Sequence, residues 1–131
     1  MKQEVIDLIK YRLEKSRSTL LDAKKYFEDA TSESAVNRIY YAMFYAVNAL
    51  LITKGFSSSK HAGILGIFNR EIVNKGLIEK ELGKFYSEML DNRQEGDYKD
   101  FVKFEKEDVK VWLEKAEKFI DKIEKLTLNL I

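Results

Sequence analysis

Residues 35–52 read AVNRIYYAMFYAVNALLI, and apolar side chains would cover nearly every side of a helix formed by them. A helix with a single apolar stripe lies at a protein surface, whereas a helix that is apolar all round is buried. We therefore predict that this segment is the central helix of the fold. Ser32 or Ser34 can cap its start, and it continues to Lys54 before Gly55 ends it.

The segments on either side predict four more helices. Residues 3–28 and 106–128 are long, and each places an apolar residue at every third or fourth position, so each has one apolar face and the two can pair. A third helix is predicted from about residue 57 to 75 and a fourth over 79–93. Short connections favour antiparallel neighbours. The predicted fold is all-α, an up-and-down bundle of four to five helices.

Composition limits the function further. The 131 residues fit one domain, 1–131, and 23 basic against 22 acidic residues leave a net charge of +1, without the basic excess of a dedicated DNA-binding domain. With no cysteine and one histidine we expect no metal site and no cofactor. The apolar run 39–52 is too short to cross a bilayer, and the first ten residues contain acids, unlike a signal peptide. We expect a cytoplasmic protein with no membrane segment.

Four polar residues in the central helix share one side of it: Asn37, Tyr41, Tyr45 and Asn48. Their spacing of three or four residues would let them line a polar seam or a dimer contact. Alternatively, their hydroxyl and amide groups bond to neighbouring backbone at the edge of the core.

Arg38 and His61 are the other two unusual residues. A guanidinium cannot lose its charge, so Arg38 needs an acid, a phosphate or a path to solvent, and Asp97 or Glu95 could pair with it. His61 is expected in the first turn of the third helix, on its apolar side, where a lone histidine serves mainly in packing.

The stretch DNRQEGDYKDF, residues 91–101, is predicted as an irregular loop between the fourth and fifth helices. Such a loop is longer than most helix connections, and long loops tend to carry function or to fold onto the body of the domain. Tyr98, Phe101 and Phe104 are the side chains expected to anchor it in a packed Ω-type connection.

Three blocks in this order, RIYYAMFYAVNALLITKG (38–55), SSSKHAGILGIFNREIVNKG (57–76) and ELGKFYSEMLDNRQEGDYKDF (81–101), resemble small prokaryotic HEPN-domain proteins. The resemblance extends from about residue 23 to 123. It implies a bundle of four to five helices that commonly forms a two-fold homodimer. It also implies a minimal nucleotidyltransferase as partner. Several such proteins are metal-independent ribonucleases that act as toxins, with the nucleotidyltransferase as antitoxin.

The ribonuclease motif of that family is an arginine followed, after four to six residues, by a histidine near the end of a late helix. Arg93 matches the arginine, and Tyr98 stands where the histidine would be with four residues between. Some family members are controlled by AMP transfer onto a tyrosine two residues beyond the histidine. Asp100 occupies that position here, and Tyr98 is the nearest tyrosine.

Metal-free RNA cleavage needs a base, an acid and a cation beside the phosphorus. Arg93 can supply the cation. Histidine suits proton transfer because its pKa lies near neutrality, whereas Tyr98 can donate a hydrogen bond or a proton but is a poor base. Asp97 could be a base only if burial raised its pKa. A two-fold dimer would also place two copies of Arg93 close together, which suits phosphate binding without cleavage.

Three functional hypotheses follow. The first is a homodimeric binding module that pairs with a minimal nucleotidyltransferase and holds a nucleotide or RNA phosphate at Arg93, with Arg38 and Tyr41 as further contacts. The second is a ribonuclease toxin in which Arg93, Asp97 and Tyr98 are catalytic. The third is a structural role, in which Arg93 and Asp97 form an ion pair that only supports the fold.

Overall fold

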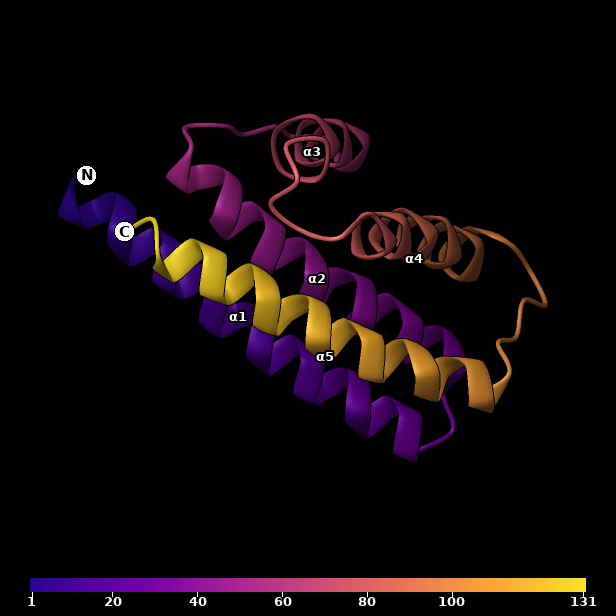
Figure 1. Cartoon of the computed structure of the whole chain (residues 1–131). Helices are drawn as coiled ribbons and strands as arrows, with labels where there is room; N and C mark the ends of the chain where they lie inside the picture. Colours follow the sequence, from indigo (N-terminus) through magenta and orange to yellow (C-terminus); the bar gives the residue numbers. More distant parts are fainter.

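The computed structural model describes residues 1–131 and contains helices but no strands. The elements are α1 (Gln3–Glu28), α2 (Ser32–Thr53), α3 (His61–Phe68), a π-helical turn η1 (Asn69–Val73), α4 (Lys80–Tyr98) and α5 (Lys106–Leu128). The three long helices α1, α2 and α5 lie side by side, and α3 and α4 lie on the other side of α2 (Figure 1). The predicted all-α helical bundle is confirmed.

The central position of α2 is also confirmed, because it packs against α1, α3, α4 and α5. Half of its residues are buried: Ala35, Val36, Ile39, Tyr40, Ala42, Met43, Ala46, Val47, Ala49, Leu50 and Leu51. Each large apolar side chain buried in this way stabilises the fold by about 1.5–3 kcal/mol. The same helix therefore holds the core together and sets the positions of the polar side chains that it carries.

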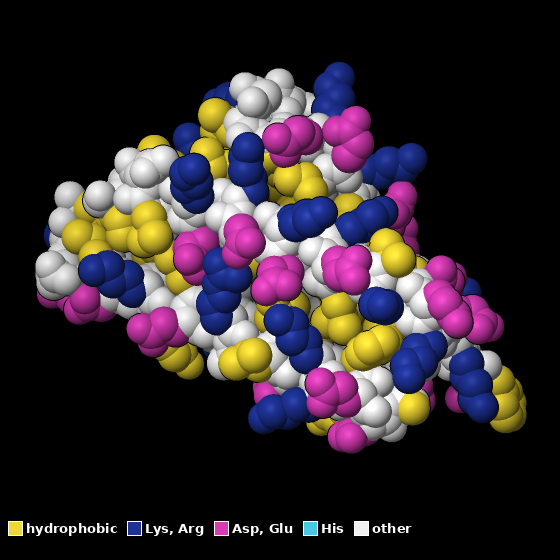
Figure 2. Space-filling model, turned by 60° about the horizontal axis from the view of Figure 1, so that its bottom comes forward, with side chains coloured by type: hydrophobic (Ala, Val, Ile, Leu, Met, Phe, Trp, Pro, Cys, Tyr) yellow, Lys and Arg dark blue, Asp and Glu magenta, His cyan; other side chains and the backbone are white.

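The helices α1 and α5 pair, as their apolar stripes predict, and three ion pairs connect their outer sides. Arg17 lies 2.8 Å from Asp121 and 3.1 Å from Glu124, and Lys24 lies 3.5 Å from Glu117. Exposed pairs of this kind contribute at most about 1 kcal/mol each, so the burial of apolar side chains contributes most of the stability of this helix pair. Figure 2 shows acidic and basic side chains mixed over this face. No helix combines the length and hydropathy that a membrane span requires.

The predicted third helix is shorter at its start and changes its winding near its end. It begins at His61 rather than at residue 57, and from Asn69 the backbone widens into η1, in which the N–H of Asn74 donates to the carbonyl of Asn69 at 2.8 Å. Gly55 and Gly76 follow the ends of α2 and η1 with φ values of 80° and 75°. Glycine reaches this left-handed region without strain, which explains why the helices stop there.

The predicted loop over residues 91–101 is largely wrong, because α4 continues as a helix to Tyr98. Only residues 99–105 connect α4 to α5. The segment contains no proline, and most of its polar side chains are compatible with a helix. The N–H of Lys99 donates to the carbonyl of Glu95 at 3.1 Å and closes the last turn. Residues that would have been scattered along a loop therefore share a helical face.

Two of the three expected loop anchors are also wrong. Tyr98 is 77% exposed, and Phe101 is fully exposed with a left-handed φ of 63°. Phe104 alone packs down: its ring meets the ring of Trp112 edge-on at 5.7 Å between centroids, and its N–H lies 3.4 Å from the hydroxyl oxygen of Ser32. One aromatic contact therefore holds the connection against the body of the bundle.

Candidate functional site

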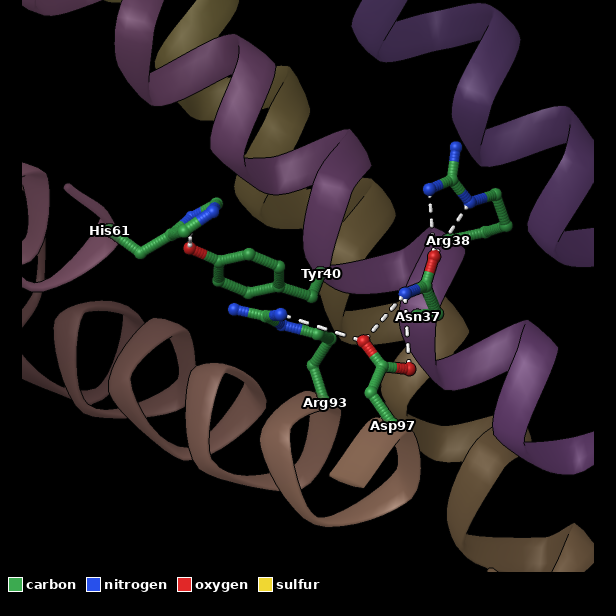
Figure 3. Close-up of polar contacts among 6 residues, drawn as sticks. All are labelled: Asn37, Arg38, Tyr40, His61, Arg93 and Asp97. Atoms are coloured by element: carbon green, nitrogen blue, oxygen red, sulfur yellow. Dashed lines mark hydrogen bonds and ion pairs between the residues drawn. The ribbon is translucent and has the colours of Figure 1, made fainter. Parts of the chain in front are cut away.

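The central residue of the site is Arg93, whose side chain points from α4 toward α2 and is 4% exposed (Figure 3). A guanidinium has five N–H donors and stays charged when buried. Its ion-pair partner is Asp97, one helical turn further on, with Nη1 and Oδ2 3.5 Å apart. Its Nε is buried without any hydrogen-bond partner. The site therefore presents a buried positive charge that makes one long hydrogen bond within the protein, to Asp97.

Three tyrosine rings surround this guanidinium. The ring centroids of Tyr40, Tyr41 and Tyr98 lie 5.2, 5.5 and 5.9 Å from its central carbon. A cation beside an aromatic face gains about 0.5–2 kcal/mol, which offsets part of the cost of burying Arg93. Aromatic faces do not replace the strong hydrogen bonds that the N–H groups make to water or to an anion.

A polar chain connects Arg93 to a second arginine on α2. Arg38 donates from Nε and Nη2 to the side-chain oxygen of Asn37, at 2.9 and 2.7 Å. The amide nitrogen of Asn37 donates to both carboxylate oxygens of Asp97, at 3.2 and 3.0 Å, and Asp97 faces Arg93 (Figure 3). The predicted direct pairing of Arg38 with Asp97 or Glu95 is wrong. Asn37 stands between the two charges because its amide group can accept from one and donate to the other.

A surface hollow of about 240 Å³ lies over the polar contacts that join Arg38, Asn37 and Asp97. Its lining residues are Tyr26, Glu33, Ser34, Asn37, Arg38 and Asp97. The hollow is polar and open, and Arg38 reaches it while its guanidinium also lies 5.0 Å from the ring centroid of Tyr41. Both arginines therefore flank the same tyrosine, with solvent access on the Arg38 side.

The structure brings all five sequence-predicted site residues into one cluster: Arg38, Tyr41, Arg93, Asp97 and Tyr98. The cluster does not include Glu95, which pairs with Lys99 at 3.6 Å. Asn48 donates to the carbonyl of Phe44 at 3.0 Å, as expected of a residue that is satisfied locally. No three histidine or acidic side chains are grouped as a metal ion would need.

Sequence reasoning missed a contact between Tyr40 and His61. The hydroxyl of Tyr40 lies 2.8 Å from Nδ1 of His61, and the imidazole also packs on Phe44 at 4.5 Å between centroids. Burial raises the pKa of Tyr40 to about 12. Burial, helped by the positive charge of Arg93, lowers the pKa of His61 below its usual value. The half-buried packing role expected for His61 is present, but its ring also borders the arginine site.

Fold and site together define an α-helical bundle built around a buried, incompletely paired arginine. The HEPN domain family model matches residues 9–126, and the chain belongs to this family. It is 53% identical over 123 residues to a UPF0332 protein of Thermotoga maritima, covering 94% of this chain and 93% of the relative.

Two further relatives come from Methanocaldococcus jannaschii. “Putative toxin MJ0142” is 32% identical over 117 residues, which cover 89% of this chain and 80% of the relative. “Putative toxin MJ0605” is 34% identical over 131 residues, which cover 100% of this chain and 97% of the relative. Similarity to these proteins thus extends over nearly the whole bundle.

Proposed function

We propose that this protein is a HEPN-domain binding module that holds a phosphate group of a nucleotide or RNA at Arg93. The observation that carries the proposal is the buried guanidinium of Arg93, whose one ion-pair contact, to Asp97, is long at 3.5 Å and leaves the charge incompletely paired. A phosphate oxygen accepts the charge-assisted hydrogen bonds that such a group leaves unmade. The additional contacts are Arg38, which lines the open hollow, and Tyr41, whose ring lies beside both arginines.

The proposed assembly is a homodimer that pairs with a minimal nucleotidyltransferase, in keeping with membership of the HEPN family. A two-fold dimer that brings two copies of Arg93 together would place both on one phosphate chain, which increases affinity through paired contacts. Sedimentation of the purified chain tests the dimer. Co-expression with a tagged minimal nucleotidyltransferase from the same genome tests the pairing, and recovery of the tagged protein alone contradicts it.

Titration with AMP and with a short fluorescein-labelled RNA tests phosphate binding. The wild type is expected to bind at least one of them at low salt, and Arg93→Ala is expected to weaken binding by roughly 10- to 150-fold, since hydrogen bonds to charged groups contribute about 1.5–3 kcal/mol. Arg70→Ala is the matched control, because Arg70 is 61% exposed and pairs with its neighbour Glu71. Equal binding by the two variants, or none by the wild type, contradicts the proposal.

A ribonuclease toxin is the second candidate, favoured by the two relatives named as toxins. In this reaction the 2′-hydroxyl oxygen attacks phosphorus, the bond to the 5′-oxygen breaks, and a cyclic phosphate and a 5′-hydroxyl result. Asp97 would take the proton of the 2′-hydroxyl, Tyr98 would protonate the leaving oxygen, and Arg93 would stabilise the charged phosphorane. Tyr98 is 77% exposed and the Asp97 side chain is 27% exposed, so neither has the deep burial that tunes a group for proton transfer.

Incubation of the protein with end-labelled RNA in EDTA separates the two candidates. Cleavage by the wild type that Arg93→Ala abolishes, in a variant still folded by circular dichroism, establishes the toxin reaction. Binding without cleavage favours the module. Host growth during expression gives an independent measure, because an active toxin slows growth and Arg93→Ala restores it.

A further inference from the structure

The environment of His61 differs from that of a residue that only fills space. His61 begins α3, and its Nδ1 is 2.8 Å from the hydroxyl of Tyr40. Its ring also lies 5.6 Å from the ring of Tyr41. The guanidinium of Arg93 is 5.2 Å from the same Tyr40 ring, reached from α4 (Figure 3). The imidazole from α3 and the guanidinium from α4 thus both contact the phenol ring of Tyr40 on α2.

The hydrogen bond between Tyr40 and His61 links the tautomer of the imidazole to the direction in which the hydroxyl donates. Tyr40 is fully buried and remains a neutral phenol near pH 7, since burial raises its pKa to about 12. When this hydroxyl donates to Nδ1 of His61, the neutral imidazole keeps its proton on Nε2. Nε2 has no protein partner, and it is not sealed from solvent as the Nε of Arg93 is. In that tautomer, an N–H donor remains available at the edge of the arginine site.

We propose that His61 is the second anion contact of the Arg93 site, with its Nε2–H donating to an oxygen of the phosphate group that Arg93 binds. This inference rests on the proposed function. It adds a histidine from α3, which lies before Arg93 in the sequence and is therefore not part of a motif in which the histidine follows the arginine. Tyr40 is the positioning residue, because its hydroxyl fixes both the orientation and the tautomer of the imidazole. The ligand class is a phosphate ester with at least one free oxygen, as in a nucleoside monophosphate or an RNA diester.

The charges around His61 predict how binding affects its protonation. The groups facing it are Tyr40 and Tyr41 from α2 and Arg93 from α4. Burial and, after it, the positive charge of Arg93 lower the pKa of His61. A phosphate on Arg93 compensates that charge and places negative oxygens beside the imidazole. The bound state therefore favours His61 in its protonated form, and binding should raise its pKa.

His61→Asn gives the sharpest test, since the asparagine side chain keeps an oxygen near the position of Nδ1 but has no group at the position of Nε2. The probes are AMP and an RNA dinucleotide diester, titrated by calorimetry into wild type, His61→Asn, Tyr40→Phe and Arg93→Ala. We expect His61→Asn to lose about tenfold or more in affinity, and Tyr40→Phe to lose less because the imidazole remains. Tyr11→Phe is the control, since Tyr11 is 53% exposed.

Nitrogen NMR adds a readout that a packing role would not change. The chain has a single histidine, so its imidazole signals need no assignment. We expect the Nε2–H tautomer in the free protein and a higher His61 pKa with ligand bound. If AMP or the dinucleotide binds through Arg93 while His61→Asn keeps wild-type affinity and the pKa stays unchanged, His61 is not a contact and the proposed function stands. If the wild type binds neither probe, the proposed function fails and this inference fails with it.

The two probes also distinguish the source of the phosphate. Binding of AMP with weak binding of the dinucleotide indicates a terminal phosphate, and the reverse order indicates an RNA diester. Either order supports the contact between His61 and the phosphate, provided that His61→Asn lowers the affinity for the ligand that binds more tightly. An unchanged affinity of His61→Asn for the stronger ligand overturns it.

Discussion

Arg93 and Asp97 lie one turn apart on α4, and the 3.5 Å between Nη1 and Oδ2 exceeds the roughly 2.7–2.9 Å of a charge-assisted hydrogen bond. The two carboxylate oxygens of Asp97 are closer to the amide of Asn37, at 3.0 and 3.2 Å. Asp97 is therefore shared, and Arg93 receives only part of its negative charge. Such incomplete pairing is expected of the proposed anion site, whereas a structural ion pair would have a shorter, direct contact.

Arg93→Met tests that distinction through stability. A buried charge without a full partner costs desolvation energy, so an apolar side chain of similar size should leave the free energy of unfolding unchanged or raise it by up to about 2 kcal/mol. Urea unfolding measures the difference, and Arg70→Met, at an exposed position, is the control. A loss of more than about 1 kcal/mol without any effect on phosphate binding would instead favour the structural role.

Asp97→Asn should act in the opposite direction. It removes the negative charge nearest to Arg93, so we expect a loss of about 1 kcal/mol, kept small because the Asp97 side chain is 27% exposed. Urea unfolding again gives the value. Asp91→Asn, at an exposed position on the same helix, is the matched control and should change stability little. Equal effects of the two substitutions would contradict the assigned charge pairing.

Tyr40→Phe tests the contact with His61 in the absence of ligand. The ring and its packing remain while the hydroxyl is lost, so the free energy of unfolding should fall by about 1 kcal/mol. The imidazole should also lose its fixed tautomer, which nitrogen NMR detects. An unchanged mixture of tautomers would mean that the hydroxyl does not control the ring.

The lowered pKa of His61 predicts a pH effect on stability. As pH falls through about 6.5, the unfolded chain binds a proton at this residue before the folded chain does, so the free energy of unfolding decreases. The decrease levels off once His61 is also protonated in the folded state. Urea unfolding of wild type and His61→Asn between about pH 7.5 and pH 5.5 isolates the contribution of His61, because the carboxylates contribute equally to the stability of both proteins. Parallel profiles would contradict the lowered pKa.

Gly83→Ala tests the packing that positions α4. A β-carbon at Gly83 would lie 2.7 Å from Cγ2 and 3.1 Å from Cγ1 of Val73, a residue of η1 that is 9% exposed. Alanine raises helix propensity by about 1 kcal/mol, but the clash with a branched, buried side chain costs more. We expect a net loss of about 1–2 kcal/mol in thermal or urea unfolding, and no further loss when Gly83→Ala is added to Val73→Ala.

The sequence predicts the bundle well where periodicity is strong. The apolar stripes of α1 and α5 and the all-round apolar character of α2 give each helix its type and its partner surface. The end of α4 is not predicted, because its acidic and polar residues with one glycine are typical of a loop. In the structure, Asn37 of α2 bonds to Asp97 and the helix extends to Tyr98.

The candidate site divides in the same way. Arg93 and Asp97 follow from a spacing of four residues within one segment, and their closeness could be predicted once that segment is a helix. Tyr40 and His61 are separated by 21 positions and lie on different helices. No periodicity within either helix indicates that α3 starts beside that tyrosine, so this contact depends on the tertiary structure alone.

The edge-on contact of Phe104 with Trp112 makes the connection after α4 observable without a label. Trp112 is the only tryptophan of the chain, so ultraviolet emission excited at the indole band reports on a single environment. Phe104 lies six residues after Tyr98, whose ring borders Arg93. Any movement of this connection when an anion enters the site changes the quenching of one indole, and stopped-flow mixing can time it.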